Sequence, residues 1–146
     1  MPIKKVSYSR RLHGVRNGYR SGLEEEIADL LDSYGVPYEY ESFKIKYIQP
    51  EQGRTYTPDF ILHNGIIIET KGIFSSEDRK KHLLIQKQLP HLDIRFVFSN
   101  ANARIYKGST TRNRDWCDQH GFQWAHHTIP KAWLREKRNE ERIYKP

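Results

Sequence analysis

Residues 57–72 of this chain are TPDFILHNGIIIETKG, two apolar runs rich in β-branched residues on either side of a His-Asn-Gly turn. Runs of this kind joined by a short turn predict a β-hairpin. Asp59, Glu69 and Lys71 occupy strand positions that are otherwise filled by isoleucine, leucine and phenylalanine. A charge in such a position is costly unless an opposite charge or a metal ion compensates it. These three residues are therefore the first candidates for a functional site.

The register of the hairpin decides whether the three charged residues meet. A two-residue turn at Asn64-Gly65 would place Asp59 and Glu69 on opposite faces of the sheet. A three-residue loop over 63–65 instead brings Asp59 opposite Glu69, with Lys71 on the same face. Glycine adopts the left-handed conformation that closes such a loop without a steric penalty. We therefore predict the three-residue loop.

Two carboxylates on one face of a hairpin are typical ligands of a hard divalent cation, which prefers oxygen donors. The spacing alone is a weak signal, but Pro58 before the aspartate and the strand-turn-strand context make it more specific. A second interpretation stays open. It is a solvated hairpin face on which Asp59 and Lys71 form a cross-strand ion pair.

The segments before the hairpin carry clear periodic signals. Apolar residues at helical spacing predict a helix over 21–35, with a serine cap at its start and a glycine at its end. Residues 38–48 are rich in aromatic and β-branched residues, which favour a strand. Their alternation changes phase near Ser42, which indicates a bulge or a break.

The segments after the hairpin alternate between helix and strand. Ser75 or Ser76 can cap a helix that ends before Pro90. The elements expected next are a mostly buried strand over 94–98, a short helix over 115–120, a strand over 122–125 and a last helix beginning at Pro130.

Length and composition bound the class of protein. A chain of 146 residues with 36% hydrophobic content predicts one domain with a modest core, over residues 21–146. No apolar run reaches membrane-spanning length and no signal peptide is evident, so we expect a soluble, intracellular protein that does not bind a membrane. The single cysteine, Cys117, excludes an intrachain disulfide, and we expect it to be buried on a helix. Without a GxxxxGK loop, no nucleotide cofactor is expected.

Positive charge is concentrated at the start of the chain. Residues 1–20 contain six basic residues and no acid, against a net charge of +7 for the whole chain. This predicts a flexible basic arm that contacts nucleic acid, with a solubilising tail as the alternative. A second basic cluster lies on the helix expected after Ser75, where phosphate positioning and a solvated helix face explain it equally well. The candidate DNA-binding residues are Lys4, Lys5, Arg10, Arg11, Arg16, Arg20, Arg79, Lys80, Lys81 and His82.

Several short stretches occur in an order and with gaps that are typical of one protein family. They are SGLE at 21–24, YTPDF at 56–60, ETKG at 69–72 and DRKKHLLI at 78–85. On these residues the chain resembles the phage endonuclease I family of Holliday-junction resolvases. The resemblance implies the PD-(D/E)xK nuclease superfamily, with an α/β, restriction-endonuclease-like α-β-β-β-α-β core, a mixed sheet flanked by helices and a domain-swapped dimer.

The resemblance also implies an activity. It is that of a metal-dependent, structure-selective endodeoxyribonuclease that resolves four-way (Holliday) and other branched DNA by phosphodiester hydrolysis, in the host cytoplasm if the protein comes from a phage. Asp59, Glu69 and the backbone carbonyl of Thr70 would hold one or two Mg²⁺ ions, for which Mn²⁺ can substitute. Lys71 would orient the attacking water or stabilise the developing anion. Glu24 would complete the catalytic and metal site.

Glu24 has a second explanation. Ser21-x-x-Glu24 matches a capping box, in which the glutamate accepts a hydrogen bond from the serine amide. The resemblance favours the metal ligand, and it implies that protomers exchange residues 21–48, so that Glu24 of one chain completes the site of the other. A homodimer is also expected because two opposed strands are cut most simply by two identical sites.

Two other functions remain open at this stage. One is a non-catalytic basic DNA-binding or architectural protein whose acidic cluster is only structural. The other is a linear-duplex nuclease of the same superfamily. Cleavage with and without magnesium separates the first from a nuclease, and a comparison of branched with linear substrates separates the second.

Overall fold

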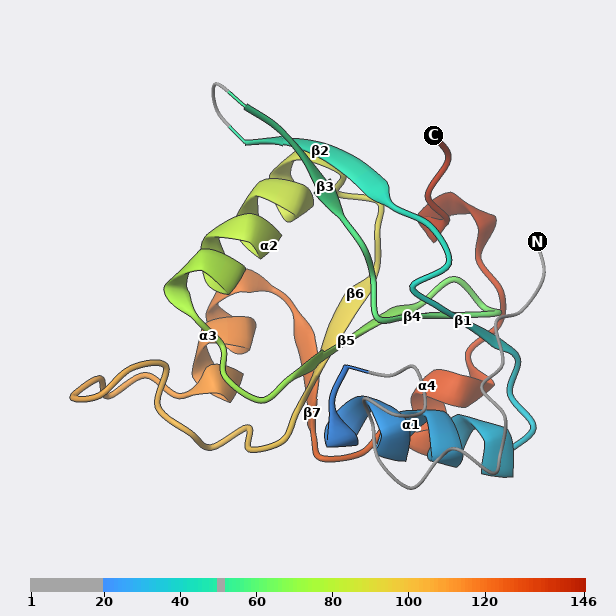
Figure 1. Cartoon of the computed structure of the whole chain (residues 1–146), viewed down its shortest axis with the longest axis horizontal. Helices are drawn as coiled ribbons and strands as arrows, with labels where there is room; N and C mark the ends of the chain where they lie inside the picture. Colours follow the sequence, from blue (N-terminus) through green and yellow to red (C-terminus); the bar gives the residue numbers. More distant parts are fainter. Residues whose placement is uncertain (1–19, 50–51) are drawn as a thin grey trace.

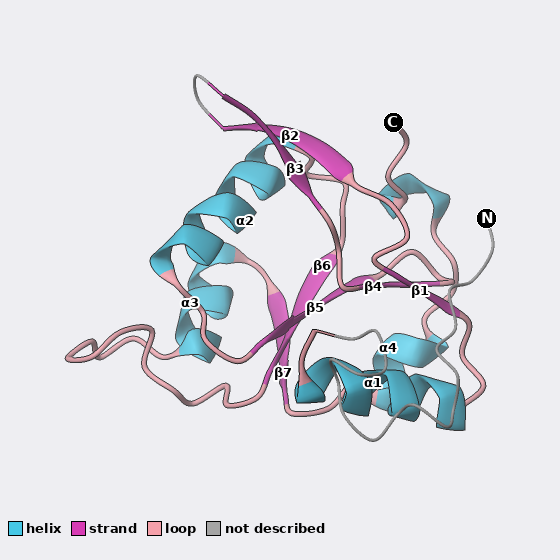
Figure 2. Ribbon diagram, in the orientation of Figure 1, coloured by secondary structure: helices cyan, strands magenta, loops and turns pink. Residues whose placement is uncertain are grey.

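The computed structural model describes residues 20–49 and 52–146, and the predicted basic arm lies outside them except for Arg20. The described chain is a mixed α/β fold in which helices flank a sheet (Figures 1 and 2). The elements in chain order are α1 (Gly22–Ser33), β1 (Tyr38–Tyr40), β2 (Ile45–Gln49), β3 (Gln52–Tyr56), β4 (Phe60–Leu62), β5 (Ile67–Lys71), α2 (Ser76–Gln88), β6 (Ile94–Phe98), α3 (Asn113–His120), β7 (Gln123–His126), α4 (Lys131–Arg135) and a 3₁₀ turn (Glu140–Arg142).

The main sheet has five strands in the order β1-β4-β5-β6-β7. β4 pairs antiparallel with β1 and β5, whereas β5, β6 and β7 run parallel. The parallel part follows from the connections, because α2 and α3 each lie between two of these strands in the sequence. All five residues of β6 are buried, as expected for a central parallel strand covered on both faces.

Two hydrophobic cores lie on opposite faces of this sheet. Ile68 packs with α1 and α4 residues, whereas Ile67 packs with residues of α2 and α3. This alternation is the two-residue period of a strand. Glu69 and Lys71 follow Ile67 by two and four positions on β5. Their side chains therefore also point toward the α2 side of the sheet.

The hairpin of β4 and β5 has the predicted register. Phe60 pairs with Ile68 and Ile61 pairs with Ile67. The Gly65 amide donates to the carbonyl of Leu62 at 2.9 Å, and Gly65 has a φ of +96°, a backbone conformation that favours glycine. The three-residue loop is therefore confirmed.

The segment over 38–48 is broken where its alternation changes phase. β1 ends at Tyr40, Glu41 has a φ of +46°, and β2 begins at Ile45 in a separate two-stranded sheet with β3. This second hairpin packs over α2 (Figure 1). The predicted break is confirmed, and its consequence is that the β2–β3 hairpin stands between β1 and β4 in the chain.

The remaining element predictions hold with small shifts. α2 begins after the cap Ser75, and α3 begins at Asn113, two residues before the predicted start. Pro130 is the cap of α4 and not its first residue. Cys117 is buried on α3, as predicted. Within the described residues, the helices are too short or too polar to cross a bilayer.

Candidate active site

Asp59 immediately precedes β4 and Glu69 lies within β5, and both are buried. Oδ2 of Asp59 accepts hydrogen bonds from the amide and the hydroxyl of Thr70, at 2.9 and 2.8 Å. Oε2 of Glu69 lies 3.4 Å from the Asp59 amide that donates to it. The interpretation as a solvated hairpin face does not fit this burial.

Lys71 extends the same face toward α2. Its ammonium lies 3.8 Å from Oε1 of Glu69 and 3.4 Å from Oδ1 of Asp78. The alternative cross-strand partner, Asp59, is not its ion-pair partner among the described residues. The hairpin thus brings Glu69 and Lys71 together on the α2 side, with the Asp59 amide next to Glu69, whereas the Asp59 carboxylate bonds to Thr70.

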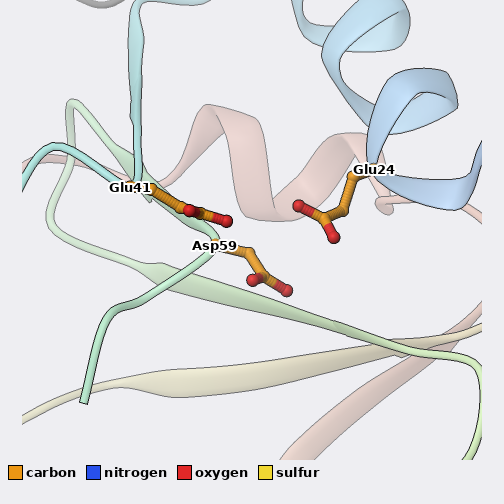
Figure 3. Close-up of side chains that lie close together, drawn as sticks. All are labelled: Glu24, Glu41 and Asp59. Carbon is orange, nitrogen blue, oxygen red and sulfur yellow. The ribbon is translucent and has the colours of Figure 1, made fainter. Parts of the chain in front are cut away.

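Glu24 reaches this site from the first turn of α1. The Ser21 hydroxyl caps the helix by accepting from the Glu24 amide at 3.1 Å. The Glu24 carboxylate does not complete a capping box with the Ser21 amide; its Oε2 accepts from the Tyr40 hydroxyl. Figure 3 shows this carboxylate directed toward Asp59.

Glu41 is a further acid in the site that the sequence did not reveal. Glu24, Glu41 and Asp59 each offer an oxygen within 4.8 Å of the others (Figure 3). Glu41 lies at the break after β1, where its positive φ turns the chain, and Arg20 Nε lies 3.7 Å from its Oε2. An acid at the phase change of the strand was the only signal. The cluster is compatible with a divalent metal ion.

The electrostatics of the site disfavour three bare carboxylates. Burial and the neighbouring Asp59 charge raise the pKa of Glu69 to about 8 and that of Glu24 to about 7. Burial also raises the pKa of Asp59, against the opposing effect of its hydrogen bonds from Thr70. A divalent cation favours the charged form of such groups, so that its binding releases their protons. This donor set, made only of oxygens, fits Mg²⁺ or Mn²⁺.

His82 forms part of the wall behind Glu69. Its side chain has no exposed surface, and its ring packs edge-on against Tyr56 and Phe96, with centroids 5.2 and 4.9 Å apart. Burial lowers its pKa well below the ordinary value. The predicted contact of His82 with DNA does not fit this position, because a buried imidazole does not reach a phosphate.

The other basic residues of α2 have different surroundings. Arg79 donates to the carbonyls of Phe74 and Ile105, at 2.6 and 3.2 Å, and so ties two loops together. Lys80 and Lys81 line a groove between α2 and the β2–β3 hairpin. The groove residues are Tyr47, Arg54, Glu77, Lys80, Lys81, Leu83, Leu84 and Lys87. The sequence prediction missed Arg54 and Lys87, because only the packing of the hairpin on α2 brings them beside Lys80.

Buried carboxylates and a lysine thus lie next to a basic groove, an arrangement that is compatible with a divalent metal ion and an anionic substrate. The family model described as phage endonuclease I matches residues 5–145, and the chain belongs to that family. This confirms the resemblance found in the sequence.

Two relatives agree with the family. The chain is 48% identical to Endonuclease I of Escherichia phage T7 over 129 residues, which cover 87% of each protein. It is 50% identical to Endodeoxyribonuclease 1 of Enterobacteria phage T3 over 122 residues, which cover 84% of this chain and 80% of the relative. The protein is therefore a phage-type endonuclease.

Proposed function

We propose that this protein is a metal-dependent, structure-selective endodeoxyribonuclease that resolves four-way (Holliday) and other branched DNA. The observation that carries the proposal is the acidic cluster of Glu24, Glu41 and Asp59. Next to it, the buried Glu69 accepts from the Asp59 amide and lies beside Lys71. The name of one relative, Endodeoxyribonuclease 1, supports DNA as the substrate. Buried acids at this density are unfavourable unless a cation compensates them.

The proposed metal ligands are Asp59, Glu69, the backbone carbonyl of Thr70 and Glu24. Mg²⁺ is the proposed ion, one or two per site, with Mn²⁺ as a substitute. When bound, it supplies an activated water and stabilises charge on the phosphoryl oxygens. Lys71 is held by Glu69 and Asp78 on the open side of the site, where its ammonium orients the attacking water and stabilises the developing anion.

The groove beside α2 is the proposed path of a DNA arm. Lys81 connects it to the acids, because its ammonium lies 5.2 Å from the ring centroid of Tyr56, whose hydroxyl donates to Glu69. Lys80, Arg54 and Lys87 continue the positive lining away from the site. Phosphates of a duplex arm would follow this lining, as basic side chains position nucleic acid through its backbone. We propose the same role for Arg20 and the basic residues of the preceding arm.

A homodimer that exchanges residues 21–48 remains part of the proposal. In the single chain, Glu24 lies beside Asp59 of the same chain, and the β2–β3 hairpin separates the two in sequence. Exchange would place the same contacts between protomers. A mixture of Glu24→Ala and Asp59→Ala chains tests it, because exchange leaves one intact site in each heterodimer, whereas without exchange both sites are damaged. Cross-linking of the mixture verifies that heterodimers form.

One cleavage experiment tests the function. A four-way junction, a flap, a nicked duplex and a linear duplex are incubated with the protein, with and without Mg²⁺. We expect cleavage that requires the metal and prefers branched substrates. Equal cleavage of the linear duplex would favour the linear-duplex nuclease, and cleavage in excess chelator would refute metal dependence.

A further inference from the structure

Two tyrosines bond directly to the proposed metal ligands. The Tyr56 hydroxyl donates to Oε2 of Glu69 at 2.5 Å, and the Tyr40 hydroxyl donates to Oε2 of Glu24. In each carboxylate the Oε2 atom is therefore already bound to a tyrosine. Oε1 of Glu24 has a longer contact, 3.4 Å from the Ser21 hydroxyl that donates to it. Oε1 of Glu69 is the oxygen that faces Lys71, at 3.8 Å.

Both tyrosines are held rigidly by their surroundings. Tyr56 is 0% exposed and Tyr40 is 1% exposed. The Tyr56 ring packs edge-on against His82. The Tyr40 ring lies 5.2 Å from that of Phe60, between centroids. The Tyr40 oxygen also accepts from the amide of Arg20 at 3.1 Å, which leaves its only hydrogen for an acceptor such as Glu24.

Asp59 follows the same arrangement through a different donor. Its Oδ2 is the oxygen that accepts both hydrogen bonds from Thr70. All three buried acids thus have one named oxygen fixed by a donor from a neighbouring strand. A donor on one oxygen restricts rotation of the carboxylate and favours coordination of a cation through the other oxygen.

We infer that Tyr40 and Tyr56 are positioning residues that present Glu24 and Glu69 to the metal through a single oxygen each. This inference rests on the proposed function. The two tyrosines flank the β2–β3 hairpin, since Tyr40 ends β1 and Tyr56 ends β3. The segment from Tyr40 to Tyr56, which contains this hairpin, therefore links the α1 side of the site to the β5 side, because a hydroxyl at each of its ends holds an acid.

The test removes one hydroxyl at a time. Tyr56→Phe and Tyr40→Phe keep the ring and delete only the donor. Mn²⁺ binding is measured by calorimetry on the full-length protein without DNA. We expect each variant to bind Mn²⁺ about 10-fold to 100-fold more weakly, the scale found when groups that orient metal ligands are removed. At saturating DNA, kcat should fall, with KM for DNA unchanged.

Tyr144→Phe is the matched control. The Tyr144 hydroxyl accepts from the amide of Lys46 on the β2–β3 hairpin at 3.2 Å, and it has no bond to a site carboxylate among the described residues. Its Mn²⁺ affinity and kcat should equal those of the wild type. Circular dichroism and thermal unfolding establish that the variants are folded.

The Mn²⁺-binding measurements distinguish a failure of the inference about the two tyrosines from a failure of the proposed function. If the wild type binds no Mn²⁺, the proposed function fails. If the wild type binds Mn²⁺ and both phenylalanine variants bind it equally well, only the inference is overturned. A crystal structure of the wild type with Mn²⁺ gives a second test that needs no variant. Coordination of Glu69 through Oε1 alone supports the inference, and coordination through both oxygens overturns it.

Discussion

Glu69→Gln should make the metal-free protein more stable at alkaline pH while it removes activity. Glu69 is only 4% exposed, and burial together with the Asp59 charge raises its pKa from 4.5 to about 8. A folded-state pKa above the unfolded value means that folding favours the protonated acid. The stabilisation by this proton is fully present below pH 4.5 and is lost as the pH rises through 8.

The size of the effect follows from the two pKa values. At about 1.4 kcal/mol per pKa unit, the wild type should lose up to about 5 kcal/mol of unfolding free energy between pH 5 and pH 9. Glutamine is neutral at every pH, and its carbonyl can still accept the hydrogen bond from Tyr56. The variant should therefore match the wild type near pH 5 and exceed it by several kcal/mol at pH 9.

Urea unfolding in excess chelator at pH 5, 7 and 9 measures both proteins. Addition of Mn²⁺ at pH 8 should reverse their order, because only the wild type gains the full binding free energy. Glu77→Gln, which changes an exposed carboxylate on α2, should follow the wild type at every pH. Parallel curves for the wild type and Glu69→Gln would refute the claim that this buried acid is destabilising when charged.

Three further predictions concern catalysis, DNA binding and packing. Asp59→Asn should lower cleavage of a branched substrate by about 10³-fold or more, while junction affinity in a gel-shift assay with chelator stays unchanged; normal cleavage would remove Asp59 from the site. Arg54→Gln and Lys87→Gln should each make the plot of log DNA affinity against log salt concentration less steep, by about 0.9 if each residue contacts one phosphate. An unchanged slope would exclude the groove as a DNA path. His82→Phe should keep full activity and raise the unfolding free energy in urea by about 1 kcal/mol. The reason is that both ring nitrogens of His82 lack a hydrogen-bond partner within the described residues. Loss of cleavage would show that the imidazole has a functional role.

The sequence predicted the parts of the site that local geometry determines. The register of the β4–β5 hairpin depends on the turn, and the turn depends on the backbone freedom of Gly65. With the register known, the two-residue period of a strand places Glu69 and Lys71 on one face. Asp59 precedes β4, and its carboxylate bonds to the hydroxyl of Thr70 and groups with Glu24 and Glu41, which the strand period did not predict. The cap Ser21 likewise identified the start of α1, and of the two candidate caps of α2, Ser75 and Ser76, the structure has Ser75.

The parts that were missed depend on contacts between distant segments. Glu41 joins the site because β1 pairs with β4, where its amide donates to the Asp59 carbonyl at 3.3 Å. The Tyr40 hydroxyl joins it by donating to Glu24 of α1. No local pattern specifies these contacts. His82 is different, since a local signal existed. It precedes Ile85 by three residues, and both lie on the buried face of α2, so helical spacing predicts an interior position. We predicted that His82 contacts DNA because the residues that precede it in the sequence are basic.

The burial of Cys117 has a practical consequence for the question of segment exchange. It is the only cysteine of the chain, it is 0% exposed, and burial raises the pKa of its thiol. Thiol-directed probes should therefore leave it unmodified. A single cysteine introduced at an exposed position would carry one spin label per protomer without further engineering. The separation of the two labels in a dimer would then report directly how its two chains are interwoven.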